Sequence, residues 1–424
     1  MICVLLCWLS PAAGQSRDLA GAWQGSWLRA GDTLPVTMVV RRDTTPGRYL
    51  ASFSSDRLRV SGVPFEQVSV EGCCDVMLVL RGDRSAYEFK GRIHGDSLTG
   101  VFREGTNEGR FAFRRAVLQP SPYDERDITF RSGDVTLAGT LLLPNVGGRV
   151  PAVVFLHGSG PEGRWASRYL ATQFAAHGFA SLVFDKRGVG SSTGDWRTAT
   201  PDDLVGDAVA AVSRLLAEPR IDSTRIGIHG HSQGGTLAPK VAVRSSHVDF
   251  VIASAAAGLP TDSVELYSLL SFVLPNAPTA EDSASAMQYA TEVVAVAYRG
   301  QPRVLLDSLA VLLKERPWFF PLPAPDNAYW AFSRAFALYD PLEWWAQVRV
   351  PVLLVYGADD QRVPAAESAA RIAAVLRETG NTQLTTRIFP GADHTLRLRP
   401  GPSGWPVTAP DYISSLVSWL AQRR

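Results

Sequence analysis

One pentapeptide, Gly-His-Ser-Gln-Gly at residues 230–234, constrains the fold of this chain more than any other stretch. Residues 225–229, just before it, form a short and largely apolar run that is typical of a buried strand. Residues 233–243 carry the alanines, leucine and valines of a helix packed on a sheet. A strand that turns at once into a helix forces Ser232 into a strained backbone conformation, and the glycines on both sides remove Cβ atoms that would clash there.

The turn predicted here is a nucleophile elbow, built from Gly230, His231 and Gly234 around Ser232. We expect the serine hydroxyl to project at the top of the sheet, beside the amino end of the following helix. Gly-x-Ser-x-Gly also arises by chance as an ordinary turn in a chain with 36 glycines. The strand-then-helix context, together with partner residues elsewhere in the chain, favours the elbow.

The C-terminal two thirds of the chain alternates apolar runs with helical patterns. Residues 128–130 and 135–143 are typical of an antiparallel pair of strands. The strands expected after that pair are 152–156, 179–184, 225–229, 249–255, 350–356 and 385–389. This alternation predicts an α/β domain over residues 127–424, with a mostly parallel sheet covered by helices on both faces.

The N-terminal part of the chain has a different pattern. Short alternating runs, separated by Gly and Asp turn signals, cover residues 18–116 and predict a small all-β domain, either a barrel or a sandwich. Because Pro120 and Pro122 fix φ, we place a linker at residues 117–126. No cluster of catalytic side chains stands out in the β domain, so its expected role is to pack on or shade the catalytic domain.

An insertion at about residues 259–340 interrupts the alternation of strands and helices. Its pattern is helical and rich in proline and aromatic residues, and it lies between two expected strands of the sheet. An insertion of this length at the edge where the serine emerges predicts a cap over the site. Its aromatic residues include Trp318, Phe319, Phe320, Tyr329, Trp330, Phe332 and Phe336. We expect most of them to form the interior of the cap and a few to line an apolar substrate pocket, and the sequence does not indicate which.

A serine hydroxyl is a poor nucleophile at neutral pH and needs a base, which in turn needs a third group to hold its tautomer. Two loops after Ser232 offer these groups at the carboxyl ends of expected strands, where parallel sheets place their sites. His394 follows the last of these strands and is the expected base. Asp359 and Asp360 compete for the role of the acid. We choose Asp360, which leaves Asp-x-x-Val-Pro running into the next helix, and interpret Asp359 as a solvated turn residue.

The oxyanion of an acyl-transfer transition state needs fixed hydrogen-bond donors. The backbone N–H of Gln233, at the start of the elbow helix, is the first candidate donor. The second should come from the glycine-rich loop that follows strand 152–156. We assign it to the N–H of Ser159, with Gly158 as the alternative. His157 in the same loop is expected to anchor the loop rather than to act in catalysis.

Five motifs resemble those of the α/β-hydrolase fold and, more narrowly, of bacterial secreted serine esterases related to the dienelactone-hydrolase and acylaminoacyl-peptidase branches. They are HGSGP (157–161), FDKRGVGSS (184–192), GHSQGG (230–235), YGADDQRVP (356–364) and PGADHT (390–395). The resemblance covers the whole predicted α/β domain and implies a triad of Ser232, Asp360 and His394. It also implies that Asp185 and Arg187 fix a structural loop. Dienelactone hydrolases themselves use a cysteine nucleophile, so the serine departs from that branch. The predicted β domain resembles the small β domain that some of these esterases carry.

Composition and charge exclude several classes of partner. A net charge of +1 without a basic run argues against nucleic acid. No metal-binding cluster or nucleotide-binding glycine loop is present in the sequence, so neither a metal nor a cofactor is expected. Residues 1–16 predict a signal peptide, and hence a secreted or periplasmic protein. No other segment reaches the roughly 18 apolar residues of a membrane span, so stable membrane insertion is not expected. Cys73 and Cys74 fit either a vicinal disulfide or two thiols.

These observations together predict a serine carboxylic-ester hydrolase that acts through an acyl-enzyme on small to medium esters with apolar acyl groups. One alternative is a serine peptidase or amidase of the prolyl-oligopeptidase type. The β domain is too short for a propeller and shows no blade repeat, which argues against that alternative. Another is a non-catalytic binding protein on a hydrolase scaffold, which an intact triad disfavours. The sequence does not indicate an oligomeric state.

Overall fold

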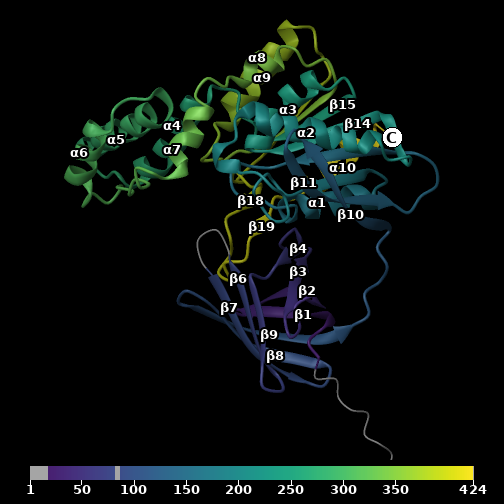
Figure 1. Cartoon of the computed structure of the whole chain (residues 1–424). Helices are drawn as coiled ribbons and strands as arrows, with labels where there is room; N and C mark the ends of the chain where they lie inside the picture. Colours follow the sequence, from purple (N-terminus) through teal and green to yellow (C-terminus); the bar gives the residue numbers. More distant parts are fainter. Residues whose placement is uncertain (1–17, 82–85, 424) are drawn as a thin grey trace, which may run out of the picture. The chain divides into compact units, whose positions relative to one another are not determined.

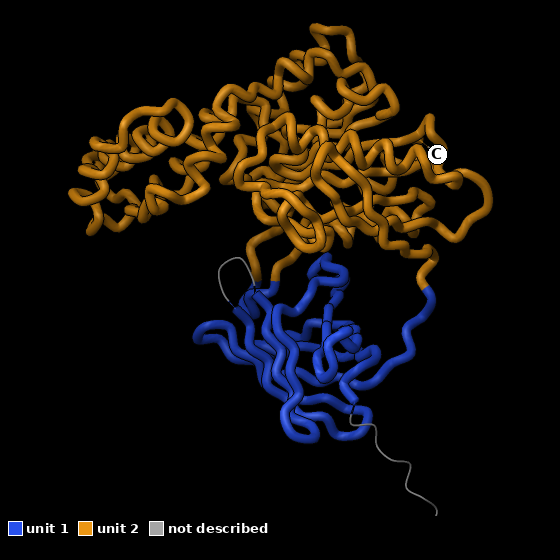
Figure 2. Tube along the Cα trace, in the orientation of Figure 1, with its two compact units in different colours: residues 1–120, 401–405 blue, residues 121–400, 406–424 orange. Residues whose placement is uncertain are grey.

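The computed structural model describes residues 18–81 and 86–423. The predicted signal peptide at residues 1–16 therefore lies outside the described residues. The chain divides into two compact units, shown in two colours in Figure 2. The first contains residues up to Pro120 together with Gly401–Trp405, and the second contains Ser121–Pro400 and Pro406–Arg424.

The smaller unit is a single nine-stranded antiparallel sheet in the order β4-β3-β2-β1-β9-β8-β7-β6-β5. Its strands are β1 (Gly21–Arg29), β2 (Asp32–Arg42), β3 (Tyr49–Ser55), β4 (Val60–Pro64), β5 (Gln67–Glu71), β6 (Asp75–Arg81), β7 (Ala86–His94), β8 (Ser97–Glu104) and β9 (Asn107–Ala116). Buried and exposed side chains alternate along these strands, because successive side chains of a strand point to opposite faces. The inward face carries an aromatic core that includes Trp27, Phe89 and Phe102. The all-β prediction is confirmed: the strands form one curled sheet, a half-barrel rather than a sandwich, in which Phe53 of β3 and Phe89 of β7 both pack against Trp27.

Residues Gly401–Trp405 belong to the smaller unit, although they follow the α/β domain in sequence. Trp405 lies in the aromatic core of the β unit, and the Arg29 guanidinium lies 4.0 Å from the centre of its ring. Arg29 also donates a hydrogen bond of 2.6 Å to the Ser403 carbonyl, and the Ser403 hydroxyl donates one of 2.7 Å to Asp32. The prediction that residues 127–424 form one uninterrupted domain is therefore wrong at this point. Burial of the large Trp405 ring in the core of the β unit explains why residues 401–405 belong to that unit and not to the α/β unit.

The predicted linker at residues 117–126 also needs correction. Strand β10 (Tyr123–Ser132) begins inside that range and pairs along its whole length with β11 (Val135–Pro144). The pairing starts opposite Pro144, so the antiparallel ladder extends the α/β unit several residues toward the N-terminus.

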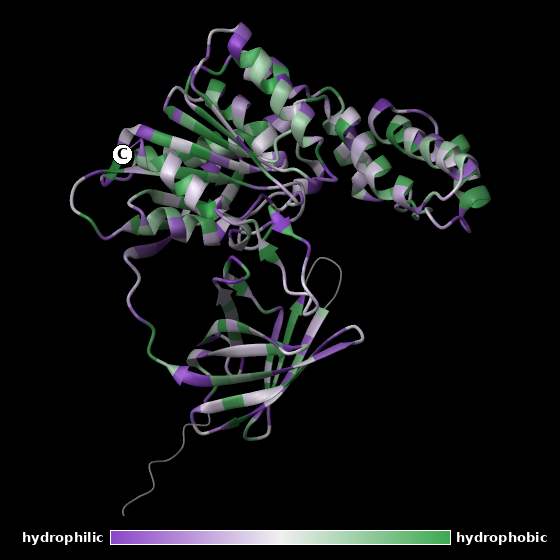
Figure 3. Cartoon of the chain, turned by 180° about the vertical axis from the view of Figure 1, so that it is seen from behind, coloured by the Kyte–Doolittle hydropathy of each residue, from purple (hydrophilic) through white to green (hydrophobic). Residues whose placement is uncertain are grey.

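The larger unit contains an eight-stranded sheet in the order β10-β11-β13-β12-β14-β15-β16-β17. Its remaining strands are β12 (Val150–Leu156), β13 (Ala180–Phe184), β14 (Ile221–His231), β15 (Val248–Ser254), β16 (Val352–Gly357) and β17 (Leu384–Phe389). The strands from β12 to β17 are parallel to one another, and β10 and β11 form the antiparallel end. The central strands are continuous apolar runs, visible in green in Figure 3, because helices cover both faces. The predicted α/β class is confirmed.

Two groups of helices cover this sheet. The helices that pack on it are α1 (Trp165–Ala176), α2 (Pro201–Leu216), α3 (Gln233–Arg244), α8 (Pro341–Trp345), α9 (Ala365–Glu378) and α10 (Tyr412–Ala421). Side chains of α1 and α10 share one apolar cluster with the sheet, and those of α2, α3 and α9 share another. Two short strands, β18 (Arg397–Leu398) and β19 (Val407–Thr408), pair as a small hairpin that the sequence did not indicate.

The insertion between β15 and β16 is helical, as its pattern predicts. It contains α4 (Thr261–Val273), α5 (Ala280–Arg299), α6 (Val304–Leu313) and α7 (Ala328–Ala335). These helices form a lobe beside the sheet layers and have their own core, in which Tyr289 and Trp318 are buried (Figure 1). Gly300 ends α5 in the left-handed conformation that glycine adopts without strain.

Candidate active site

The predicted elbow is present, and its backbone geometry explains the glycines. Ser232 lies between the end of β14 and the start of α3. Its backbone angles, φ 54° and ψ −118°, are a combination that residues other than glycine rarely adopt. A Cβ atom on Gly230 would lie 2.2 Å from the carbonyl oxygen of Gly234. A Cβ atom on Gly234 would lie 2.7 Å from the carbonyl oxygen of Leu156. Only glycine allows strand and helix to approach this closely around the serine.

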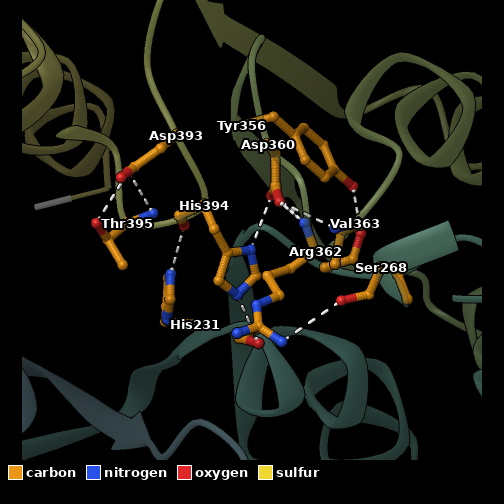
Figure 4. A network of polar contacts seen from close by, with 12 residues as sticks. His231, Ser268, Tyr356, Asp360, Arg362, Val363, Asp393, His394 and Thr395 are labelled. Atoms are coloured by element: carbon orange, nitrogen blue, oxygen red, sulfur yellow. Dashed lines mark hydrogen bonds and ion pairs between the residues drawn. The ribbon is translucent and has the colours of Figure 1, made fainter. Parts of the chain in front are cut away.

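Three side chains from three separate loops form one chain of hydrogen bonds. The Oγ atom of Ser232 lies 2.9 Å from Nε2 of His394. Nδ1 of the same ring lies 2.8 Å from Oδ2 of Asp360, a contact drawn in Figure 4. When Nδ1 carries the proton, Nε2 is free to accept the hydroxyl proton of the serine. The structure therefore brings together the serine, the acid and the base that the sequence indicated, in the arrangement of a Ser-His-Asp triad.

Asp360, rather than Asp359, is the carboxylate that faces the imidazole. Asp360 is only 2% exposed, and its second oxygen accepts the backbone N–H groups of Arg362 and Val363 at 2.7 and 2.9 Å. A buried carboxylate needs such donors to remain stable in its place. The hydroxyl of Tyr267, on α4, donates to the carbonyl of Asp360 at 2.8 Å. Asp359 is exposed, which agrees with its interpretation as a turn residue.

His231 is hydrogen-bonded to the backbone of the loop that carries His394. Its Nε2 atom donates to the carbonyl oxygen of His394 at 2.9 Å, and the two ring centres are 5.0 Å apart (Figure 4). Burial lowers the pKa of His231, and the neighbouring His394 lowers it further. A ring kept neutral in this way holds the backbone of His394 without adding a second positive charge beside the base.

The structure separates the two candidates for the second oxyanion donor. The N–H of Gly158 donates to Oε2 of Glu162 at 2.7 Å, so it is not available to a substrate and the alternative of Gly158 is wrong. The N–H of Ser159 has no acceptor among the described residues, and Ser159 lines the same cavity as Ser232. Gln233 opens α3, where the first N–H groups of a helix lack partners within it. Ser159 and Gln233 both line the cavity that contains Ser232, and their role as oxyanion donors stays a prediction.

We call the glycine-rich loop at residues 157–161, which carries the predicted donor Ser159, the oxyanion loop. Sequence reasoning missed two residues that contact it, Lys186 and Glu162. Asp185 and Arg187 are indeed tied into their own loop, through ion pairs to Arg164 and Asp207. Lys186 between them is buried, and its amine points to the oxyanion loop. Lysine is rare in this chain, with four in 424 residues, and a lysine directly after an apolar strand was a signal that could have been used.

A cavity of about 410 Å³ is lined by Ser232 and His394. Apolar side chains that line it come from α3, the cap and the loop after Asp360: Leu237, Val264, Phe332, Phe336 and Val363. Polar side chains also line it, among them Glu265 and Arg362. Burial raises the pKa of Glu265, while the hydroxyl of Tyr329, which donates to it at 3.0 Å, acts in the opposite direction. The aromatic side chains of the cap thus divide between its core and this cavity.

Residues 18–81 and 86–423 contain no group of three or more His, Cys, Asp or Glu side chains placed to hold a metal ion. Within the same residues, no helix is both long enough and apolar enough to cross a membrane. Cys73 and Cys74 are not joined in a disulfide.

Residues 153–402 match the model of the Alpha/beta hydrolase family, and the chain therefore belongs to that family. Esterase EstD of Thermotoga maritima is 25% identical over 308 residues, which cover 67% of this chain and 66% of EstD. The bifunctional esterase/perhydrolase DCH of Acinetobacter calcoaceticus is 26% identical over 281 residues, covering 58% of this chain and 87% of DCH. The quorum-quenching protein AidA of Acinetobacter baumannii is 34% identical over 119 residues, covering 28% and 39% of the two chains. The chain thus spans just under two thirds of EstD and less than half of AidA.

Proposed function

We propose that this protein is a carboxylic-ester hydrolase that works through an acyl-enzyme. The observation that carries the proposal is the unbroken hydrogen-bonded chain from Ser232 through His394 to Asp360, at the wall of a cavity large enough for a small ester. Two relatives whose names include esterase, EstD and DCH, support the same class of reaction.

The geometry suggests the following steps. The Oγ atom of Ser232 attacks the ester carbonyl carbon while Nε2 of His394 takes the hydroxyl proton. The buried carboxylate of Asp360 stabilises the imidazolium that forms. The N–H groups of Gln233 and Ser159 donate to the oxyanion of the tetrahedral intermediate. Collapse breaks the ester C–O bond, and Nε2 returns the proton to the leaving alcohol. A water molecule then attacks the acyl-serine by the same route.

The walls of the cavity support small to medium, apolar acyl groups as substrates. Leu237, Val264, Phe332 and Phe336 place aliphatic and aromatic surface beside the nucleophile. Burial of an apolar chain against such surface contributes about 0.8 kcal/mol for each CH₂ group. The rate at low substrate concentration is therefore expected to rise with acyl length until the cavity is filled.

The experiment that tests the proposal compares wild type with Ser232→Ala on p-nitrophenyl esters of increasing acyl length, on one lactone and on one aminoacyl amide. Hydrolysis of the esters by wild type, absent in the variant, supports an esterase. Faster turnover of the amide than of the matched ester would favour a peptidase. If Ser232 of the folded protein does not react with a fluorophosphonate probe, the protein is a binding protein on this scaffold.

We also propose that residues 1–16 direct export, so that the enzyme works outside the cytoplasm. The apolar run followed by small residues supports this. The test is cell fractionation followed by N-terminal sequencing. Recovery of the protein in the cytoplasm with an intact N-terminus would contradict the proposal.

A further inference from the structure

The amine of Lys186 lies behind the proposed oxyanion site and binds two separate parts of it. Lys186 follows β13 and is 1% exposed. Its Nζ atom donates to the carbonyl oxygens of Gly158 and Gly160 at 2.7 and 3.2 Å, and to Oε1 of Gln233 at 3.0 Å. One side chain therefore connects the loop after β12 with the first residue of α3.

These two segments carry the two proposed oxyanion donors. Ser159 lies between Gly158 and Gly160, so the two carbonyl groups that Lys186 holds are those on either side of it in the chain. Binding both carbonyls to one amine limits rotation of the peptide units around Ser159. Since an oxyanion donor must be held to within about 0.5 Å of its productive position, such a restraint bears directly on transition-state binding.

Glu162 completes the arrangement. Its carboxylate accepts the N–H of Gly158, so that among the two candidate donors of this loop only the N–H of Ser159 remains without an acceptor in the described residues. The titratable groups that face Lys186 are Glu162, Asp207 on α2 and His157, which directly follows β12. The ring of Trp196 lies 5.7 Å from its Nζ atom.

We propose that Lys186 and Glu162 are a positioning pair that aligns the oxyanion donors of Ser159 and Gln233. Neither side chain contacts the reacting atoms in this role. The inference rests on the proposed function of the same site, and it extends that function to residues outside the triad.

The protonation state of Lys186 gives the proposal a distinctive consequence. An ammonium group has three N–H donors, which match the three acceptors around it, whereas a neutral amine has two. Burial lowers the pKa of Lys186 to about 8, and the carboxylates of Glu162 and Asp207 oppose that shift. The matched arrangement is therefore present below pH about 8 and is lost as the pH rises through that value, and kcat should fall with it.

The first test replaces Lys186 with methionine and uses Lys240→Met as the matched control. Lys240 is also a buried lysine, 5% exposed, but it pairs with Asp202 at 2.9 Å and does not contact the oxyanion loop. We expect K186M to lower kcat by roughly 10- to 100-fold, somewhat less than removal of an oxyanion donor itself, with KM changed by less than about threefold. K240M should keep the wild-type kcat.

The second test uses pH profiles of kcat from about pH 6 to about pH 10. Wild type and K240M should lose activity on the alkaline side, and K186M should lack that loss because its single form already lacks the donors. Glu162→Gln retains an oxygen that can accept the Gly158 N–H but removes the charge that raises the pKa of Lys186. The alkaline loss should therefore move to lower pH in E162Q, which a merely structural role of Glu162 would not cause.

The rate of labelling of Ser232 by a fluorophosphonate separates this inference from the proposed function. If wild type hydrolyses no ester but labels faster than K186M, the positioning role stands and the esterase proposal fails. If wild type is an esterase and K186M matches K240M in kcat, labelling rate and pH profile, the positioning role is overturned. Thermal unfolding of K186M and K240M checks that both are folded, and E162Q provides the decision if K186M is not.

Discussion

The base side and the oxyanion side of the candidate site are held in different ways. On the base side, Asp360 and His394 touch each other directly, from loops that follow the adjacent strands β16 and β17. On the oxyanion side, the proposed donors are backbone groups, and the buried amine of Lys186 binds both segments that carry them. The base side is held by direct contact between two side chains, one of which lines the cavity that contains Ser232, whereas the oxyanion side is held by an amine that is not among the residues lining that cavity. Substitutions on the base side should remove a group that takes part in the reaction. Substitutions at Lys186 or Glu162 should leave those groups in place and misalign only the proposed oxyanion donors.

The largest effect is expected from His394→Ala on the base side. The imidazole is the hydrogen-bond partner of the Ser232 hydroxyl among the described residues, so its removal leaves the serine without a base, and kcat should fall by about 10⁵- to 10⁶-fold. Steady-state ester hydrolysis by the purified variant measures this. A loss similar to that of K186M would mean that the two sides do not differ as described.

A smaller loss is expected from Asp360→Asn, with Asp359→Asn as the control. The amide cannot accept the Nδ1–H bond while keeping its other contacts as a carboxylate does, so the tautomer of His394 is disturbed and kcat should fall by about 10⁴-fold. The exposed Asp359 should tolerate the same change within about twofold. Equal losses in the two variants would contradict the choice of acid.

The elbow lies between the two sides and can be tested through stability. In Gly230→Ala, the new Cβ would meet the backbone of Gly234 at 2.2 Å, and the free energy of unfolding should fall by about 1–3 kcal/mol. Gly147→Ala is the control, since nothing lies within 4 Å of its Cβ and its φ is not positive. Urea unfolding of both variants measures the difference. A stable G230A would show that the strand and helix are not packed as tightly as described.

The smallest effect is expected from His231→Phe. A planar aromatic ring is kept, but the donor to the carbonyl of His394 is lost, and leaving that carbonyl without its partner costs about 1–3 kcal/mol in placing the base. We expect kcat to fall by about tenfold with KM nearly constant. The pH profile should keep the alkaline loss of wild type, because Lys186 is untouched. If H231F lacked the alkaline loss of kcat, the base side and the oxyanion side of the site would be coupled.

The local sequence pattern was enough to predict the elbow, the parallel sheet and the loops that carry Asp360 and His394. A strand followed at once by Gly-x-Ser-x-Gly and a helix leaves few possible backbone paths, and loops at the ends of parallel strands meet at one edge. The same reasoning failed for Trp405, whose burial in the β unit has no periodic signature, and for the start of β10. It also left Gly158 open as a donor, since nothing in the loop sequence shows where its N–H points.

Sequence alone predicted Ser232, Asp360 and His394 as nucleophile, acid and base, because steric rules and side-chain type act over a few residues and can be followed along the chain. The tertiary structure was needed to show that Glu162 takes one oxyanion-loop N–H and that Lys186 holds that loop against α3. These contacts depend on burial, because the amine of a lysine exposed to water would exchange its carbonyl partners for water molecules. Burial is a property of the packed molecule rather than of a stretch of residues.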